Sequence, residues 1–291
     1  MKLHTAQFLD LLRIKQWIKN PLIYIALIFT NNLFNPSLFL KVTVGFFLLS
    51  FAASAIYIIN DIKDAKEDRH HPEKKNRPIA SGAIAPAFAW VICSILAVIS
   101  LAGAFIIDIK FFYVILAYII MNLFYTYKLK QVVILDLFIV AAGYVLRAIA
   151  GAVIINVAIS PWLLICTSLL ALFVIMAKRR YEMTMLTDAA KHRKILDEYS
   201  VPLIDEMTSV VTASTVIAYS LYTFTSATAA RHQYLMLTIP FVLYGIFRYL
   251  YLIHKKNLGG NPELIFLKDI PTIVNILLWV AANILIVYFL K

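Results

Sequence analysis

The chain has 291 residues, of which 62% are hydrophobic and 15% charged, and its formal net charge is +11. Because soluble domains contain only about 45 to 50% apolar residues, this composition excludes a soluble globular enzyme and a disordered chain. A disulfide-rich secreted scaffold is excluded too: the two cysteines, Cys93 and Cys166, lie inside apolar runs and predict neither a disulfide framework nor a metal cluster.

Apolar runs and the charges between them define the predicted elements in chain order. Residues 1–19 form an amphipathic pattern that predicts a short helix on the membrane surface. A helix needs roughly 20 apolar residues to cross a bilayer, and we therefore expect nine spans, the first shortened by Asn31 and Asn32. The predicted spans are residues 21–34, 38–60, 84–107, 110–127, 132–156, 161–181, 207–229, 233–253 and 270–290. The predicted fold is an all-α integral membrane bundle of nine transmembrane helices, with residues 1–291 as a single transmembrane catalytic domain.

The basic residues predict how the bundle is oriented. When the spans are followed alternately across the bilayer, 21 of the 27 Lys and Arg residues fall on the side of the amino terminus. The two long loops, residues 61–83 and 182–206, lie on that side as well. Since cytoplasmic loops are enriched in Lys and Arg, we expect the amino terminus inside, both loops as cytoplasmic caps, and a multi-pass protein of the cytoplasmic (inner) membrane.

A cluster of acidic residues closes the second predicted span. Asn60 and Asp61 end the apolar run, and Asp64 and Asp68 follow at offsets of three and seven from Asp61. On a helix these offsets place the three carboxylates on one face, where like charges need a cation, and hard oxygen ligands suit Mg²⁺. The alternative is a solvated, mixed-charge loop, but the regular spacing favours a metal site formed by the three aspartates.

Basic and polar residues near this cluster predict a cradle for phosphate groups. In the same loop they are Arg69, His71, Lys74 and Arg77. For His71 and the adjacent His70 we expect hydrogen bonding to substrate or plain solvation, because neighbours on a helix point about 100° apart. Further candidates for binding an anionic substrate are Lys19, Arg147, Lys178, Arg179, Arg180 and Glu182.

Two of these candidates have structural alternatives. Arg147 lies within a span, where a charge is costly and indicates function, yet it could also be held by a structural partner. Lys178, Arg179 and Arg180 could bind substrate or could be the charges that end a membrane helix.

The motif NDxxDxxxD at residues 60–68, followed by RPIASG, resembles the first aspartate-rich motif of the UbiA-type intramembrane prenyltransferases. The resemblance implies a nine-helix bundle in which Mg²⁺ and the aspartates bind the diphosphate of a donor beneath a cytoplasmic cap. Members of the family also carry a Tyr and a Lys, usually spaced YxxxK, at the end of the fourth helix. Here Tyr125 and Lys130 are one residue further apart, so their role stays open.

Four segments resemble one branch of that family, which makes polyprenyl-phosphoryl-phosphoribose. They are QWIKN at 16–20, DRHHPEKKNRPIASG at 68–82, LRAIAG at 146–151 and KRRYE at 178–182. Aromatic prenyltransferases of the family carry a second DxxxD motif after the sixth helix, where this chain has the basic run 178–180. One carboxylate cluster opposite a basic cluster suits two anionic substrates better than a single prenyl diphosphate. The resemblance also implies a role in cell-wall biosynthesis.

The sequence thus predicts an Mg²⁺-dependent enzyme that transfers 5-phosphoribose from phosphoribosyl pyrophosphate to a polyprenyl phosphate, with Asp61, Asp64 and Asp68 as catalytic residues. The alternative enzyme moves a prenyl group from a prenyl diphosphate to an aromatic or other polar acceptor. A lipid transporter is disfavoured because the charges gather at one membrane face, and an inactive lipid-binding relative stays open. We expect no nucleic-acid partner; the sequence does not decide between a monomer and a homo-oligomer.

Overall fold

The computed structural model describes residues 5–70, 74–185, 194–256, 258–260 and 262–290, and the regular structure among them is entirely helical. Among the described residues, eight helices are long and apolar enough to cross a membrane, when η5 and α11 are counted as one helix. They are α3 (Pro36–Lys63), α5 (Pro86–Ile107), α6 (Ile109–Tyr127), α7 (Leu135–Ile154), α8 (Pro161–Met185), α10 (Val201–Thr225), α11 (Ile239–Lys256) and α13 (Ile270–Phe289). The shorter elements are α1 (Thr5–Leu12), η1 (Ile14–Tyr24), α2 (Ile25–Phe29), α4 (Ala65–Asp68), η2 (Lys74–Asn76), η3 (Leu129–Gln131), η4 (Lys194–Glu198), η5 (Gln233–Thr238) and α12 (Pro262–Lys268).

The first predicted span, residues 21–34, differs from the expectation. It forms the end of the 3₁₀-helix η1 and then the five-residue α2. Pro21 lies inside η1 and lacks the N–H that a continuous α-helix would use, and Asn31 adopts a positive φ of 59° just after α2. The predicted count of nine spans is therefore not confirmed.

Local sequence signals explain where the long helices begin. Asn35 caps α3 by accepting hydrogen bonds from the backbone N–H groups of Ser37 and Leu38. Asp108 and Asp269 accept backbone N–H groups in the same way at α6 and α13. Capping oxygens satisfy donors that the first turn of a helix leaves without partners, so short polar residues separate successive apolar helices.

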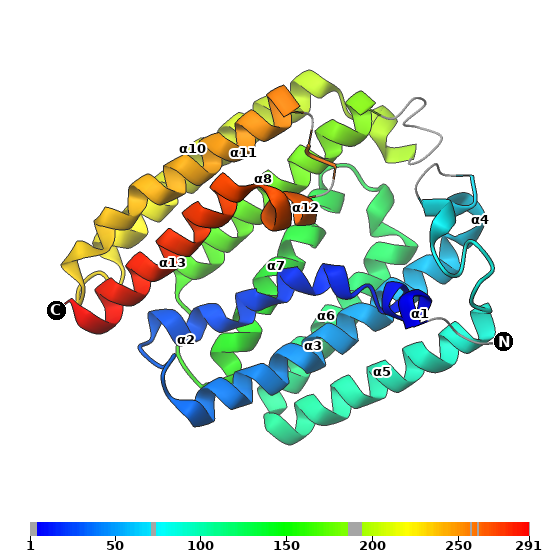
Figure 1. The fold of residues 1–291 in the computed structure, drawn as a ribbon, viewed down its shortest axis with the longest axis horizontal. Coiled ribbons are helices and arrows are strands. Elements are labelled where there is room, and N and C mark those ends of the chain that lie inside the picture. The colour runs from blue at the N-terminus through cyan, green and yellow to red at the C-terminus, as the bar shows by residue number, and fades with distance from the viewer. Residues whose placement is uncertain (1–4, 71–73, 186–193, 257, 261, 291) are drawn as a thin grey trace.

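The centre of the bundle is built around α7. This helix packs against α6, α8 and η1, while α3 packs against α5 (Figure 1). Gly151 allows the closest approach, because a Cβ placed there would lie 1.9 Å from the carbonyl oxygen of Ile23. The backbone of η1 can therefore cross α7 directly, which brings the start of the chain into the middle of the molecule.

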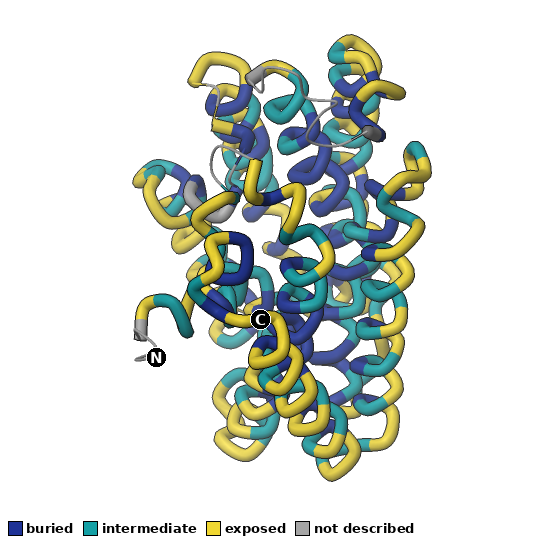
Figure 2. The backbone as a smooth tube through the Cα atoms, turned by 90° about the vertical axis from the view of Figure 1, so that its right-hand side faces the viewer, coloured by how far each residue is buried: buried dark blue, intermediate teal, exposed yellow. Residues whose placement is uncertain are grey.

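Burial follows the pattern of a membrane protein. Figure 2 shows buried stretches toward the interior of the bundle and exposed stretches on its outer side and at its ends. The outer face of α5 exposes large apolar side chains such as Val98 and Ile106, at 65% and 82%, which suits contact with lipid rather than water. The chain is a multi-pass membrane protein.

The segment before η1 contains α1, whose Leu11 is fully buried against α3. The predicted location of this segment on the membrane surface stays a prediction.

Candidate active site

A polar cavity of about 270 Å³ lies between α3, α6, α7 and α8 and extends to η1. Its described lining includes one acidic side chain, Glu182. Its basic lining residues are Lys19, Lys74, Arg77, Arg147, Lys178 and Arg179. Basic side chains therefore predominate in this lining, which favours anionic ligands.

Two of the three predicted metal ligands meet beside this cavity through one arginine. Arg77 Nη1 lies 3.1 Å from Asp61 Oδ1 and 2.5 Å from Asp68 Oδ2. Arg13 binds Asp61 as well, with Nε donating to Oδ2 at 3.1 Å and Nη2 to Oδ1. Both carboxylates are almost fully buried. Burial raises the pKa of Asp68 above its ordinary value, against the opposing effect of the Arg77 guanidinium.

Asp64 has a different cationic partner from the other two aspartates. It forms the C-cap of α3 and its carboxylate accepts from Lys130 Nζ at 2.9 and 3.2 Å. Helix α3 ends at Lys63 and α4 begins at Ala65, so the seven-residue offset from Asp61 to Asp68 does not run along one helix. In the part of the chain that the structure describes, no three His, Cys, Asp or Glu side chains gather in a position to hold a metal ion.

The donor set nevertheless fits one divalent ion. A single nitrogen of Arg77 already bridges oxygens of Asp61 and Asp68, so the two carboxylates converge on a position for one cation. Mg²⁺ is commonly held by one or two protein carboxylates, with substrate phosphates and water completing its shell. The residues that fit it are therefore Asp61 and Asp68, with Asp64 next to them on the chain.

Asn60 is held at the wall of the cavity by α6. Its Oδ1 accepts from Thr126 Oγ1 at 2.5 Å, and Lys63 Nζ donates to the Thr126 carbonyl at 2.6 Å. Thr126 is fully buried and follows Tyr125, which lines the cavity. Sequence reasoning did not identify Thr126, although its place beside Tyr125 at the end of an apolar helix was a usable signal.

Arg147 lies at the inner wall of the cavity. Its Nε donates to Asn20 Oδ1 at 2.7 Å, Nη1 to the Gly143 carbonyl at 2.7 Å and Nη2 to Tyr118 Oη at 2.9 Å. The guanidinium also lies against the rings of Tyr118 and Tyr144. Among the described residues its hydrogen-bond partners are neutral, so this buried cation carries a net charge that an anionic ligand can balance. Arg147 thus has structural partners and also lines the cavity; that it binds substrate stays a prediction.

Arg179 belongs to a second buried network. Its Nε lies 3.1 Å from Asp136 Oδ2 and its Nη1 lies 2.7 Å from Glu182 Oε2. Tyr199 donates its hydroxyl to Asp136 Oδ1 at 2.7 Å, and the backbone N–H of Ile134 donates to the Tyr199 hydroxyl at 2.6 Å. Burial and the bond to Asp136 raise the pKa of Tyr199 to about 12. Arg179 is thus fixed within the bundle, and Tyr199, which sequence reasoning missed, ties the segment after η4 to the start of α7.

Three further predicted site residues, all described by the structure, do not line the cavity. Arg180 pairs with Asp205 on α10 at 2.7 Å, Arg69 donates to the Ala80 carbonyl at 3.1 Å, and Lys130 holds Asp64. His71 lies outside the described residues.

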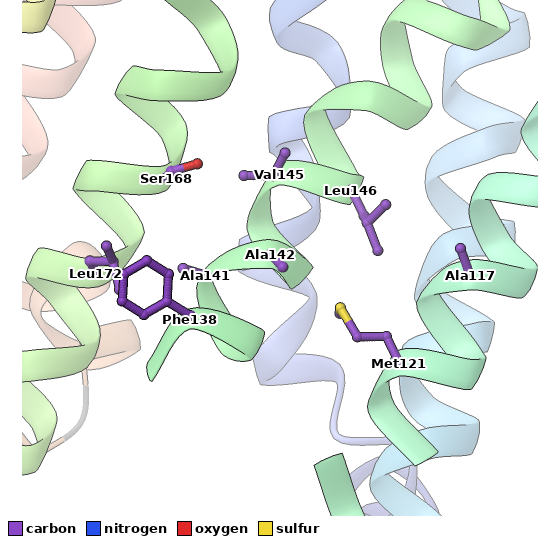
Figure 3. Close-up of a pocket in the computed structure, with 9 residues that line it drawn as sticks. All are labelled: Ala117, Met121, Phe138, Ala141, Ala142, Val145, Leu146, Ser168 and Leu172. Atoms are coloured by element: carbon purple, nitrogen blue, oxygen red, sulfur yellow. The ribbon is translucent and has the colours of Figure 1, made fainter. Parts of the chain in front are cut away.

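An apolar groove of about 510 Å³ lies on the opposite face of α7, with walls from α6 and α8 (Figure 3). Ser168 is the one polar residue among its described lining. The other lining residues are Ala117, Met121, Phe138, Ala141, Ala142, Val145, Leu146 and Leu172. At about 100° per residue, the α7 positions that line the groove and those that line the polar cavity fall on opposite sides of the helix. One helix therefore separates a hydrocarbon surface from a cationic one.

The model of the UbiA prenyltransferase family matches residues 21–269. The chain belongs to this family. As a UbiA family member it is a membrane-embedded transferase enzyme, and its aspartate-rich residues 60–68 fall inside the matched region.

Two curated relatives match this UbiA family member over almost the full length of both chains. Decaprenyl-phosphate phosphoribosyltransferase of Mycobacterium tuberculosis is 31% identical over 282 residues, covering 95% of this chain and 93% of the relative. The protein of the same name from Mycolicibacterium smegmatis is 32% identical and covers 95% and 91%. Among solved structures, a UbiA homolog from Archaeoglobus fulgidus bound to GPP and Mg²⁺ superposes with a TM-score of 0.76 at 21% identity, covering 97% of this chain and 99% of that one. That structural likeness shows the fold.

Proposed function

We propose that this enzyme transfers 5-phosphoribose from phosphoribosyl pyrophosphate to a polyprenyl phosphate, giving polyprenyl-phosphoryl-5-phosphoribose and pyrophosphate in an Mg²⁺-dependent reaction. The observation that carries the proposal is the cavity in which six basic side chains and one carboxylate meet. Two phosphorylated substrates need such an excess of cations, whereas one prenyl diphosphate with a neutral acceptor does not. The names of the curated relatives support the same reaction.

The residues divide into a donor side and an acceptor side. Asp61 and Asp68 would hold the metal ion, with Asp64 in support, and Lys74 and Arg77 would bind the diphosphate of the donor next to them. Bound there, Mg²⁺ supplies Lewis-acid stabilisation of the charge that grows on the leaving pyrophosphate.

On the acceptor side, Lys19, Arg147, Lys178 and Arg179 would hold the phosphate of the polyprenyl lipid opposite the ribose. A phosphate oxygen of the lipid attacks the anomeric carbon while the bond from that carbon to pyrophosphate breaks, with inversion at the carbon. The attacking phosphate is ionised near neutral pH, so the reaction needs no general base. The cations of the chain position the two anions against each other, and this positioning lowers the barrier.

The deciding experiment incubates the purified enzyme with phosphoribosyl pyrophosphate labelled in the ribose, a polyprenyl phosphate and Mg²⁺. We expect a labelled, lipid-extractable phosphodiester and an equal amount of pyrophosphate, both lost when EDTA removes the metal. If no labelled lipid forms although a thermal unfolding transition shows that the enzyme is folded, the proposal is contradicted.

The second candidate is transfer of a prenyl group from a prenyl diphosphate to an aromatic or other polar acceptor. It is favoured by the family description and by the solved homolog that is bound to GPP and Mg²⁺. The basic run 178–180, which stands where that reaction would use a second pair of carboxylates, disfavours it. Product formation from a prenyl diphosphate, measured beside the first assay, distinguishes the two.

We also propose that the site faces the cytoplasm of a bacterial inner membrane, with the amino terminus inside. The distribution of basic residues supports this orientation. A reporter that is active only in the cytoplasm, fused before residue 1, tests it: activity is expected, and its absence would reverse the orientation.

A further inference from the structure

Two arginines occupy the carboxylate oxygens to which the proposed metal ion would bind. Arg13 binds both oxygens of Asp61, and Arg77 binds Asp61 and Asp68 together. Two negative and two positive charges meet in this cluster, which leaves it close to neutral. Carboxylates as buried as Asp61 and Asp68 need such neutralisation, because a buried charge without a partner is strongly unfavourable.

Arg13 is held in an unusual backbone conformation for this contact. It separates α1 from η1 with φ 52° and ψ 46°, in the left-handed region that non-glycine residues rarely adopt. Its guanidinium also lies 5.2 Å from the ring centre of Tyr57, and Tyr57 lines the polar cavity. The side chain is one fifth exposed, compared with one fourth for Arg77, so neither arginine is fully enclosed by the protein.

A divalent ion and these arginines compete for the same oxygens, but a diphosphate offers the arginines new partners. Guanidinium groups bind phosphate oxygens in the same two-pronged geometry that they use for carboxylates. We propose that Arg13 and Arg77 are exchangeable counterions: they neutralise Asp61 and Asp68 in the free enzyme, and they move to the diphosphate of the substrate when a divalent ion takes the carboxylates. This inference rests on the proposed function and adds Arg13 to the donor side.

The exchange makes metal and diphosphate binding mutually dependent. Metal alone binds weakly because the arginines must leave the carboxylates without new partners. Pyrophosphate strengthens metal binding because it accepts the displaced arginines. Removing Arg13 should therefore have opposite effects on the two ligands, which a purely structural role of Arg13 does not produce.

The test measures Mn²⁺ binding to the full-length protein in detergent by electron paramagnetic resonance, with and without pyrophosphate. In Arg13→Gln, the affinity for Mn²⁺ alone should rise roughly tenfold, since a competing cation is lost, and the affinity for pyrophosphate in the presence of Mn²⁺ should fall roughly tenfold. Arg13→Lys, which keeps the charge but loses the two-pronged contact, should lie between wild type and Arg13→Gln. Lys15→Gln is the matched control, because it removes an exposed cation two residues away, and it should change neither affinity.

Arg77→Gln provides the same test from the other side of the cluster if Arg13→Gln does not fold. The exchange is wrong if both affinities fall together in the arginine variants, or if neither changes while Asp61→Asn loses Mn²⁺ binding; in these cases the metal site of the proposed function stands. If the wild-type enzyme binds no Mn²⁺ even with pyrophosphate, the proposed metal site fails together with the exchange.

Discussion

Two regions at the cavity differ in how their buried charges are balanced. At the end of α3, Asp61 and Asp68 are neutralised by Arg13 and Arg77. Deeper in the bundle, Arg147 is surrounded by an amide, a carbonyl and tyrosines rather than by a carboxylate. The first region can accept a cation and an anion together with only a small change in net charge, whereas the second gains most from an anion alone. The difference separates a metal-diphosphate side from a phosphate side.

The largest effect is expected at the neutralised region. Asp61→Asn should lower kcat/KM for phosphoribosyl transfer by about a thousandfold, because it removes a group that stabilises developing charge and leaves Arg13 without its carboxylate. Asp64→Asn should cost clearly less, since Asp64 pairs with Lys130 rather than with its neighbours. The labelled-lipid assay measures both, with the exposed Asp10→Asn as control. Equal losses in the two aspartate variants would show that Asp64 joins the site in the working enzyme.

The next effect concerns the region with net positive charge. Arg147→Met should raise the KM for polyprenyl phosphate roughly tenfold while the KM for phosphoribosyl pyrophosphate changes little, because a charged hydrogen bond to the acceptor is lost. Arg147→Lys should recover part of the loss. Arg248→Gln is the matched control, as Arg248 forms a two-pronged ion pair with Asp269 between α11 and α13. An effect of Arg147→Met on the donor instead of the acceptor would exchange the two sides of the cavity.

The sequence predicted most of the helices, but only part of the comparison between the two regions. Span length and apolarity identify long helices directly, and the part of the chain that the structure describes contains eight of them. The prediction that Asp61, Asp64 and Asp68 share one face requires one continuous helix. Helix α3 instead ends at Lys63, immediately before Asp64. Helix periodicity describes contacts within a turn or two. It cannot predict a helix end that is set by packing against other parts of the bundle.

Partners distant in the chain were beyond sequence reasoning for a different reason. Arg13 and Asp61 are 48 positions apart, and Asn20 and Arg147 are 127 apart. These contacts depend on the packing of η1 against α3 and α7, which is a property of the packed bundle. The residue type was still informative, since a basic residue within a predicted span marked Arg147 as a functional candidate before its partners were known.

A substitution of Tyr199 tests to which side of the cavity the Arg179 network belongs. Tyr199→Phe keeps the ring but removes the hydroxyl that serves Asp136 and the backbone of Ile134, and the latter has a positive φ of 68°. We expect about a fivefold higher KM for polyprenyl phosphate with kcat almost unchanged, as for the loss of one buried hydrogen bond. Steady-state kinetics with both substrates measures this. A fall in thermal stability with unchanged KM would make the network structural, and a higher KM for the donor would place Arg179 on the metal side.

The smallest effect comes from a neutralised arginine away from the cavity, which serves as a reference for the first region. Hydrogen bonds from Arg248 and Thr272 lower the pKa of Asp269 to about 2. A carboxyl whose pKa is lowered by folding stabilises the native state above its ordinary pKa of about 4, and this contribution disappears as the pH falls toward 2. The Tm of the wild-type protein should therefore fall slightly more than that of Arg248→Gln between pH 5 and pH 2.5, in the absence of metal and substrate.

Adding Mg²⁺ with pyrophosphate at neutral pH should raise the Tm of both proteins equally, because Arg248 and Asp269 exchange no partners with a ligand. Unequal stabilisation would mean that the ion pair between α11 and α13 responds to substrate as well, and the contrast with Arg13 and Arg77 would then be lost.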